Sequence, residues 1–106
     1  MKRLSFLTAI LLFGTSALAA DGKAIFEASG CGACHPAKEA GVGPSLAEIA
    51  KTYAKKEKEL VLFLEGTGKP IMIPEKFPIM KPNVAKTVAL TKAERQALAK
   101  FLLGSK

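Results

Sequence analysis

The apolar positions of this chain repeat at intervals of three and four residues in three separate stretches, and this is the spacing of one face of an α-helix. The faces consist of Ala24, Ile25 and Ala28; of Leu46, Ile49, Ala50 and Tyr53; and of Ala97, Leu98, Phe101 and Leu102. The pattern predicts a first helix to about residue 29, a second that begins at residue 45, and a last one over residues 92–103.

Polar residues at the starts of these stretches have the chemistry of helix caps. Asp21 is a suitable N-cap for the first helix. Ser45 with Glu48, and Thr91 with Glu94, match the S/T-x-x-E capping box, in which a hydroxyl and a carboxylate bind N–H groups that a helix start leaves free. Glycines mark the expected helix ends at Gly30, Gly66 and Gly104.

A further apolar stretch, residues 60–64, has no polar position and is compatible with a buried strand or with part of a helix. No second strand pattern is present to pair with it, so we favour a helix over residues 57–65. The sequence therefore predicts an all-α domain.

Prolines dominate the segment between residues 66 and 90, where Pro70, Pro74, Pro78 and Pro82 recur every four residues. Proline removes a backbone donor, and it disfavours the helical conformation of the residue before it. We therefore expect a long ordered loop without helix, and loops of this length in small domains are usually functional. The loop contains a short internal repeat, because residues 70–74 and 78–82 both read P-I-M-x-P.

The N-terminus has the pattern of a secretory signal peptide. Lys2 and Arg3 are followed by an apolar run over residues 4–13, and small residues at 17–20 form a cleavage region. We expect cleavage after Ala19 or Ala20, export to the periplasm, and no stable membrane insertion afterwards. The alternative is an uncleaved anchor, but residues 4–20 are at the lower length limit for a membrane span and include several polar positions.

Removal of residues 1–20 leaves one small domain, residues 21–106, whose core is thin and needs a further stabilising element. The formal charge is +7, and +5 remains without Lys2 and Arg3. A basic surface suits docking to acidic proteins, although a solvated lysine surface without a single partner fits equally well. Nucleic acid is not expected as a partner, because no arginine-rich patch is present.

Residues 31–35 read C-x-x-C-H and contain both cysteines of the chain, Cys31 and Cys34, and its only histidine, His35. This is the attachment motif of c-type haem, in which two thiols bind the porphyrin vinyl groups and the histidine is an axial ligand of the iron. Structural zinc normally requires four ligands, and a thioredoxin-like dithiol requires a βαβ sheet. A disulfide would leave the adjacent histidine unexplained. We therefore expect one covalent haem, which also supplies the missing core.

The iron needs a second axial ligand, or else it stays open to small molecules. A second histidine is absent, and the methionines beyond the initiator are Met72 and Met80, both in the proline-rich segment. A thioether is a soft ligand that raises the reduction potential. The alternative for either methionine is a flexible filler of the core.

These residues resemble the small bacterial class I cytochromes c over residues 21–106. The resemblance rests on Gly22 and Phe26 four residues apart, on the C-x-x-C-H motif, on Gly43-Pro44, and on Leu98 and Phe101 in the last helix. It implies about four helices wrapped round one haem. It also implies that the Pro44 carbonyl accepts a hydrogen bond from His35, and that Met80, which precedes a proline shortly before the last helix, is the iron ligand in preference to Met72, a lysine or an open site.

The resemblance further implies a monomeric periplasmic carrier of single electrons between respiratory partners, such as a cytochrome-reducing complex and a terminal oxidase or reductase, and not an enzyme. Lys38 and Lys81 are candidates for a lysine rim around the haem edge, and Tyr53 for packing or a propionate contact. The alternative is a small haem enzyme or gas-binding protein with a labile sixth ligand. A further possibility is a haem subunit of a larger complex.

Overall fold

The computed structural model describes residues 21–104, and this part of the chain contains helices and connecting segments but no strand. The α-helices are α1 (Gly22–Ala28), α2 (Leu46–Thr52), α3 (Glu57–Leu64), α4 (Phe77–Val88) and α5 (Lys92–Gly104), with short 3₁₀ turns η1 (Cys31–Ala33) and η2 (Pro74–Lys76). The all-α prediction is confirmed, and the four expected helices are present. The expected signal peptide, residues 1–20, lies outside the described residues.

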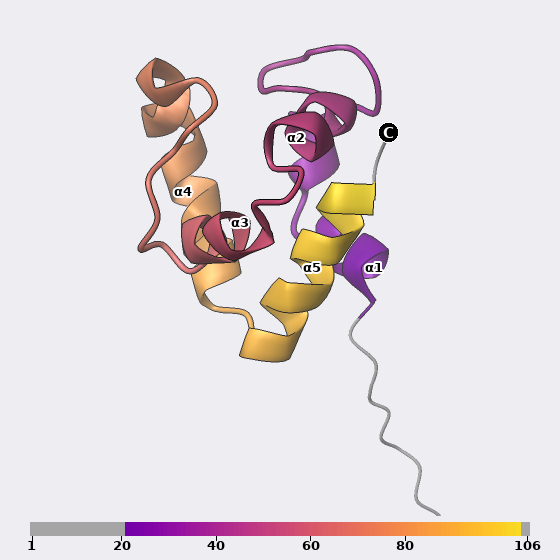
Figure 1. Cartoon of the computed structure of the whole chain (residues 1–106), viewed down its shortest axis with the longest axis vertical. Coiled ribbons are helices and arrows are strands. Elements are labelled where there is room, and N and C mark those ends of the chain that lie inside the picture. The colour runs from indigo at the N-terminus through magenta and orange to yellow at the C-terminus, as the bar shows by residue number, and fades with distance from the viewer. Residues whose placement is uncertain (1–20, 105–106) are drawn as a thin grey trace, which may run out of the picture.

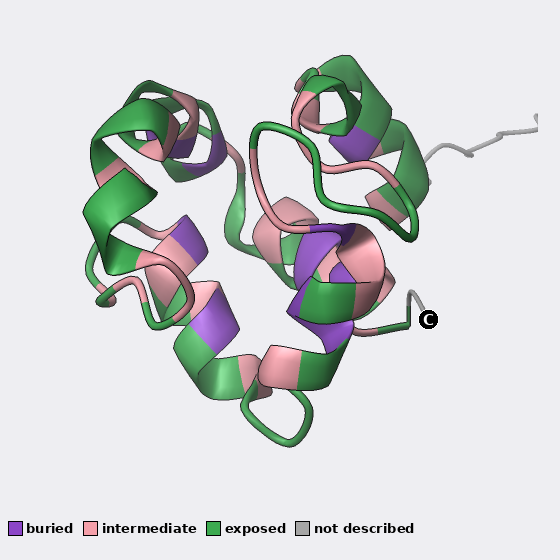
Figure 2. Ribbon diagram, turned by 90° about the horizontal axis from the view of Figure 1, so that it is seen from above, coloured by how far each residue is buried: buried purple, intermediate pink, exposed green. Residues whose placement is uncertain are grey.

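Helix α5 is the centre of the packing, since it contacts α1, α2 and α3, while α4 packs on α3. Figure 1 shows α3 and α4 on one side of the molecule and α1 and α2 on the other. Buried positions of the helices face the space between the two sides (Figure 2). The main buried cluster consists of Phe26, Ile49, Tyr53, Leu60, Leu64, Leu98, Ala99 and Leu102.

The expected helix caps are present. The Asp21 carboxylate accepts hydrogen bonds from two N–H groups in the first turn of α1, and the Ser45 hydroxyl accepts one from the Glu48 N–H at 3.1 Å. At the start of α5 the capping box is complete. The Thr91 N–H donates to the Glu94 carboxylate at 2.8 Å, and the Glu94 N–H donates to the Thr91 hydroxyl at 3.1 Å.

The crossing of α1 and α5 depends on a small residue. A Cβ atom at Gly22 would lie only 2.7 Å from Cβ of Phe101 and closer still to the Ala97 carbonyl oxygen. One turn farther along α1, the rings of Phe26 and Phe101 pack with their centroids 5.2 Å apart. This contact packs the first helix on the last and joins the two ends of the domain.

The prediction of a loop without helix over residues 66–90 is wrong in its second half, where Phe77–Val88 forms α4. Pro78 is in the first turn, where a helix has no acceptor for the N–H that proline lacks. Pro82 is inside the helix and removes one backbone hydrogen bond, the one to the Pro78 carbonyl. Burial of Val84 and Thr87 offsets that cost. Met80 therefore lies on a helix and not in a loop.

Candidate haem site

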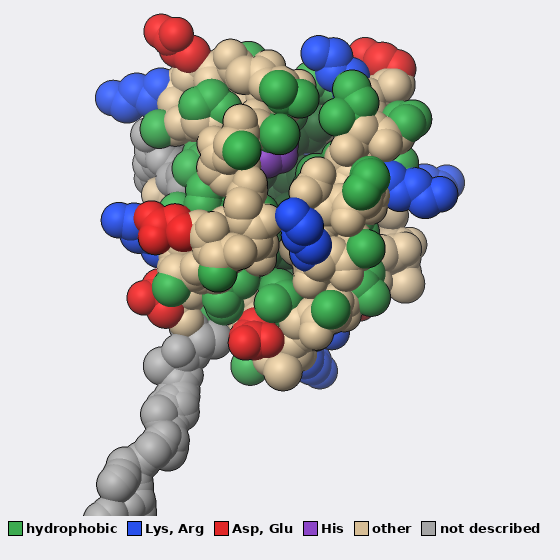
Figure 3. Space-filling view, turned by 180° about the vertical axis from the view of Figure 1, so that it is seen from behind, with side chains coloured by type: hydrophobic (Ala, Val, Ile, Leu, Met, Phe, Trp, Pro, Cys, Tyr) green, Lys and Arg blue, Asp and Glu red, His purple; other side chains and the backbone are tan. Residues whose placement is uncertain are grey.

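An open cleft lies between the two sides of the molecule, and most of its lining side chains are apolar. The space-filling view shows the histidine side chain in a hollow surrounded by hydrophobic side chains (Figure 3). The cleft therefore suits a large, flat and mainly apolar ligand.

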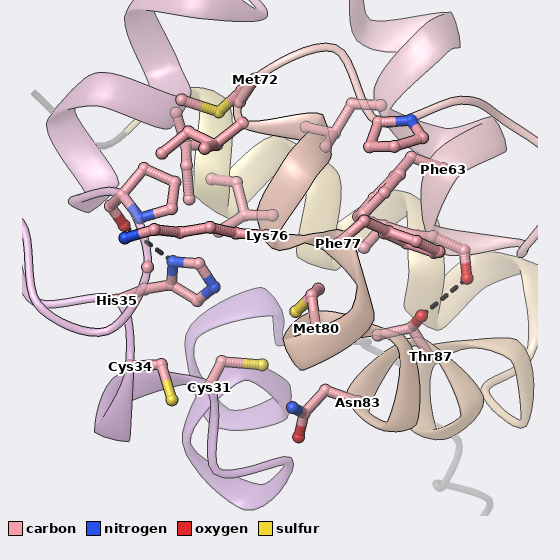
Figure 4. A pocket seen from close by; sticks show the side chains of 18 of the residues that line it. Cys31, Cys34, His35, Phe63, Met72, Lys76, Phe77, Met80, Asn83 and Thr87 are labelled. Carbon is pink, nitrogen blue, oxygen red and sulfur yellow. Dashed lines mark hydrogen bonds between the residues drawn. The ribbon is translucent and has the colours of Figure 1, made fainter.

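The C-x-x-C-H motif reaches this cleft because the chain reverses direction directly after α1. Gly30 adopts the left-handed conformation (φ 73°) and ends the helix, and η1 follows at once. The N–H groups of Cys34 and His35 both donate to the Cys31 carbonyl, at 3.2 and 3.1 Å. This single tight turn directs both thiols and the imidazole to the cleft (Figure 4).

The two thiols are free and half-buried, so both are available for covalent attachment. Burial raises the pKa of the Cys31 thiol above its ordinary value, although the positive charge of Lys86 acts in the opposite direction. The thiol is therefore mainly protonated at neutral pH.

The imidazole of His35 is oriented by Pro44. The ring nitrogen Nδ1 lies 2.7 Å from the Pro44 carbonyl oxygen. A carbonyl can only accept a hydrogen bond, so Nδ1 must carry a proton, and Nε2 is the ring nitrogen left to bind a metal. Such a bond fixes the orientation of a metal-binding histidine and makes it a better donor to the metal. The hydrogen bond implied by the resemblance is present.

Gly43 allows the close approach of the imidazole to this loop. A Cβ atom at this position would lie 2.6 Å from Cε1 of His35 and 3.0 Å from its Nδ1. No side chain fits there without moving the ring or the loop. The loop is further held by the Gly43 N–H, which donates to the Cys34 carbonyl at 2.8 Å.

Both methionines line the cleft, but they occupy different places in it. The sulfur of Met80, on α4, is directed across the cleft to the imidazole of His35 (Figure 4). In the same view Met72 lies at the end of the cleft away from the two cysteines, and it packs against the buried cluster. The structure thus brings Cys31, Cys34, His35 and Met80 together from two opposite walls.

Several residues that line the cleft were not predicted as site residues, because they lie in or next to α4, a helix that the proline pattern did not predict. Asn83 and Thr87 on α4, and Lys76 just before it, all line the cleft. A helical reading of residues 77–88 would have placed Met80, Asn83 and Thr87 on one face. The two lysines expected at the rim, Lys38 and Lys81, are exposed but do not line the cleft.

The donor set fits a c-type haem. The imidazole of His35 and the thioether of Met80 face each other across an apolar cleft, and two thiols lie along one edge of it. Nitrogen and thioether ligands are typical of haem iron in electron-transfer proteins. Tyr53, at the cleft wall, is buried within the main cluster, as expected for a packing residue.

Comparisons with known proteins agree with this site. Residues 19–106 match the family model of cytochrome c. The chain is 33% identical over 93 residues to cytochrome c-551 of Stutzerimonas stutzeri, a match that covers 85% of this chain and 82% of that relative. Within residues 21–104, no helix has both the length and the hydropathy of a membrane span. The chain therefore belongs to the cytochrome c family of electron-transport proteins and carries haem c bound covalently through Cys31 and Cys34.

Proposed function

We propose that this protein is a periplasmic carrier of single electrons in which His35 and Met80 are the axial ligands of the haem iron. The observation that carries the proposal is the position of the Met80 sulfur opposite the His35 imidazole, in the cleft that also contains both thiols. His35 and Met80 would together complete the coordination of the iron, and this favours electron transfer over binding of a substrate at the metal.

The bound haem supplies an iron that alternates between the ferric and ferrous states, and the residues of the chain set the conditions for that exchange. The Pro44 carbonyl keeps the His35 imidazole in one orientation through the 2.7 Å contact. The Met80 thioether, as a soft ligand, favours the ferrous state. With the haem bound, the apolar side chains of the cleft would replace water around much of it, which reduces the solvent rearrangement that accompanies a change of charge.

Protein redox partners fit the surface around the cleft mouth. Val42, Ile71 and Ile79 line the cleft and are also exposed to solvent, with 54%, 41% and 58% of their surface accessible. Lys76 lies at the mouth, and the chain without residues 1–20 carries a formal charge of +5. An apolar patch with basic residues nearby suits brief docking to an acidic partner, which charge attraction accelerates. The signal-peptide pattern of residues 1–20 supports a periplasmic location.

The ligand assignment is tested by the variants Met80→Ala and Met72→Ala in the haem-loaded protein. Oxidised c-type haem with a thioether ligand has a weak absorption band from the sulfur-to-iron bond. We expect this band to disappear in M80A and to remain in M72A, which removes a thioether from the same cleft. The reverse result would transfer the role to Met72.

Carbon monoxide separates the carrier from a gas-binding or catalytic haem protein. In the reduced protein at neutral pH we expect no rapid spectral change on addition of carbon monoxide, because Met80 occupies the sixth position. M80A provides the positive control, since its iron is open. Rapid binding to the unmodified protein would contradict the carrier proposal.

A further inference from the structure

Helix α4, which carries Met80, is attached to the rest of the molecule mainly at its C-terminal end. The buried Thr87 hydroxyl is within hydrogen-bond distance of two acceptors, the Leu64 carbonyl of α3 at 2.7 Å and the Val84 carbonyl of its own helix at 2.9 Å. The neighbouring Val88 packs on the left-handed residue Gly66 after α3, where an added Cβ atom would lie 2.8 Å from Cγ2 of Val88. The end of α4 is therefore pressed against the end of α3.

Arg95 of α5 completes this attachment. Its Nη1 atom lies 3.2 Å from the Thr87 carbonyl oxygen, 2.9 Å from that of Val88 and 2.5 Å from that of Leu90. The last carbonyls of a helix have no donor within the helix, and the C-terminal end of a helix carries partial negative charge. The Arg95 guanidinium therefore provides donors for the last carbonyls of α4 and places a positive charge at the C-terminal end of that helix. Its Nε atom is buried and has no partner in the described part of the chain.

The other half of α4, residues 77–81, has fewer attachments. Its ring contact joins Phe77 to Phe63 of α3, with centroids 5.8 Å apart, and no side-chain hydrogen bond of the described residues anchors it. Between this half and the anchored half lies Pro82, which provides no N–H for the Pro78 carbonyl. Met80 is thus on the weakly attached side of a break in the helix.

We infer that Arg95 is a positioning residue for Met80. It lies at the far end of α4 from the sulfur, but its three carbonyl contacts fix where that helix ends and hence the direction of the Met80 side chain. The inference rests on the proposed role of Met80 as iron ligand. If Arg95 is lost, the weakly attached half of α4 separates from the haem more often, while the rest of the fold is retained.

Imidazole added to the oxidised, haem-loaded protein measures this separation, because it binds the iron only in molecules whose sulfur has left. We expect Arg95→Met to bind imidazole about tenfold more tightly than the unmodified protein, which corresponds to about 1.4 kcal/mol. Arg95→Lys keeps the charge but not the planar fork and should lie between the two. Thr87→Val removes the bond to Leu64 with little change of shape, and it should shift the affinity in the same direction.

Asp21→Ala is the matched control, because it removes the N-cap of α1 and lowers global stability without contact with α4. Its imidazole affinity should stay within about twofold of the unmodified protein, although its unfolding midpoint falls.

An equal change of imidazole affinity in R95M and D21A would overturn the inference. An imidazole affinity that is unchanged in both R95M and T87V would overturn it as well. If M80A keeps the sulfur-to-iron band, the ligand assignment itself is wrong, and the inference fails with it. Loss of the band in M80A together with an unaltered R95M would reject the role of Arg95 alone.

Discussion

At the scale of single residues, the proximal side of the haem site depends on the absence of a side chain. Gly43 lies so close to His35 that a Cβ atom would approach the imidazole to 2.6 Å. The ring is also held by the Pro44 carbonyl on the same loop. Any displacement of the ring by a larger residue therefore also strains the hydrogen bond that orients it.

We predict that Gly43→Ala lowers the free energy of unfolding of the haem-loaded protein by about 1–3 kcal/mol, the usual cost of overpacking. Guanidinium unfolding followed by haem absorption measures the change. Gly104→Ala is the control, since an added Cβ atom there has no neighbour within 4 Å. If the two alanine variants are equally stable, the contact with His35 does not limit this position.

A second residue-scale prediction concerns alkaline pH. Burial raises the pKa of Tyr53 above its ordinary value, and this outweighs the opposing hydrogen bond with the Ile71 backbone. Above about pH 10 the unfolded chain loses the phenol proton while the folded protein keeps it, so stability falls as pH rises through the folded pKa. Below about pH 10 Tyr53 causes no such change.

The variant Tyr53→Phe lacks this proton and isolates its contribution from that of the lysines, which titrate in the same range. We expect the free energy of unfolding to decrease less in Y53F than in the unmodified protein between about pH 9 and about pH 11. Parallel pH profiles for the two proteins would show that Tyr53 titrates alike in the folded and unfolded states.

At the scale of elements, local capping chemistry is what the sequence reveals best. The caps at Asp21, Ser45 and Thr91 could be predicted because each uses a short-range hydrogen bond between residues two or three apart. The covalent motif at residues 31–35 is equally local. Helix α4 could not be predicted in this way. The cost of Pro82 to the helix is evident from the sequence, whereas the contacts that offset this cost, made by Thr87 and Arg95, arise only in the folded structure.

The same reasoning gives a prediction for α4 itself. Pro82→Ala restores the N–H that can bind the Pro78 carbonyl and removes the proline ring from the helix interior. It should therefore raise the free energy of unfolding by about 1–2 kcal/mol. This gain is smaller than the full cost of a proline inside a helix, because the unfolded chain also gains conformational freedom when the proline is removed. Chemical unfolding of the oxidised protein measures the gain. Pro78→Ala, in the first turn of the same helix, should give no comparable gain. A P82A variant no more stable than P78A would mean that the missing hydrogen bond costs α4 little.

At the scale of the whole molecule, the fold and the haem are parts of one structure. Every member of the main buried cluster except Ala99 also lines the cleft. The side chains that form the core are therefore the same ones that face the haem, and a domain of this size has no second core to replace it. The arrangement of helices follows from that shared surface, which no local sequence pattern describes.

We predict that the chain without haem is largely unfolded. Its core would expose apolar surface to water at the cleft, and burial of apolar surface is the main force that stabilises a small domain. Circular dichroism of the purified haem-free protein should show weak helical signal and no cooperative thermal transition, whereas the haem-loaded protein should melt cooperatively. The double variant Cys31→Ala with Cys34→Ala cannot attach haem covalently, and preparations of it without haem absorption serve as a second haem-free sample. Native-like helix with a sharp melting transition in either sample would show that the α1–α5 crossing at Gly22 and Phe101 suffices to hold the fold.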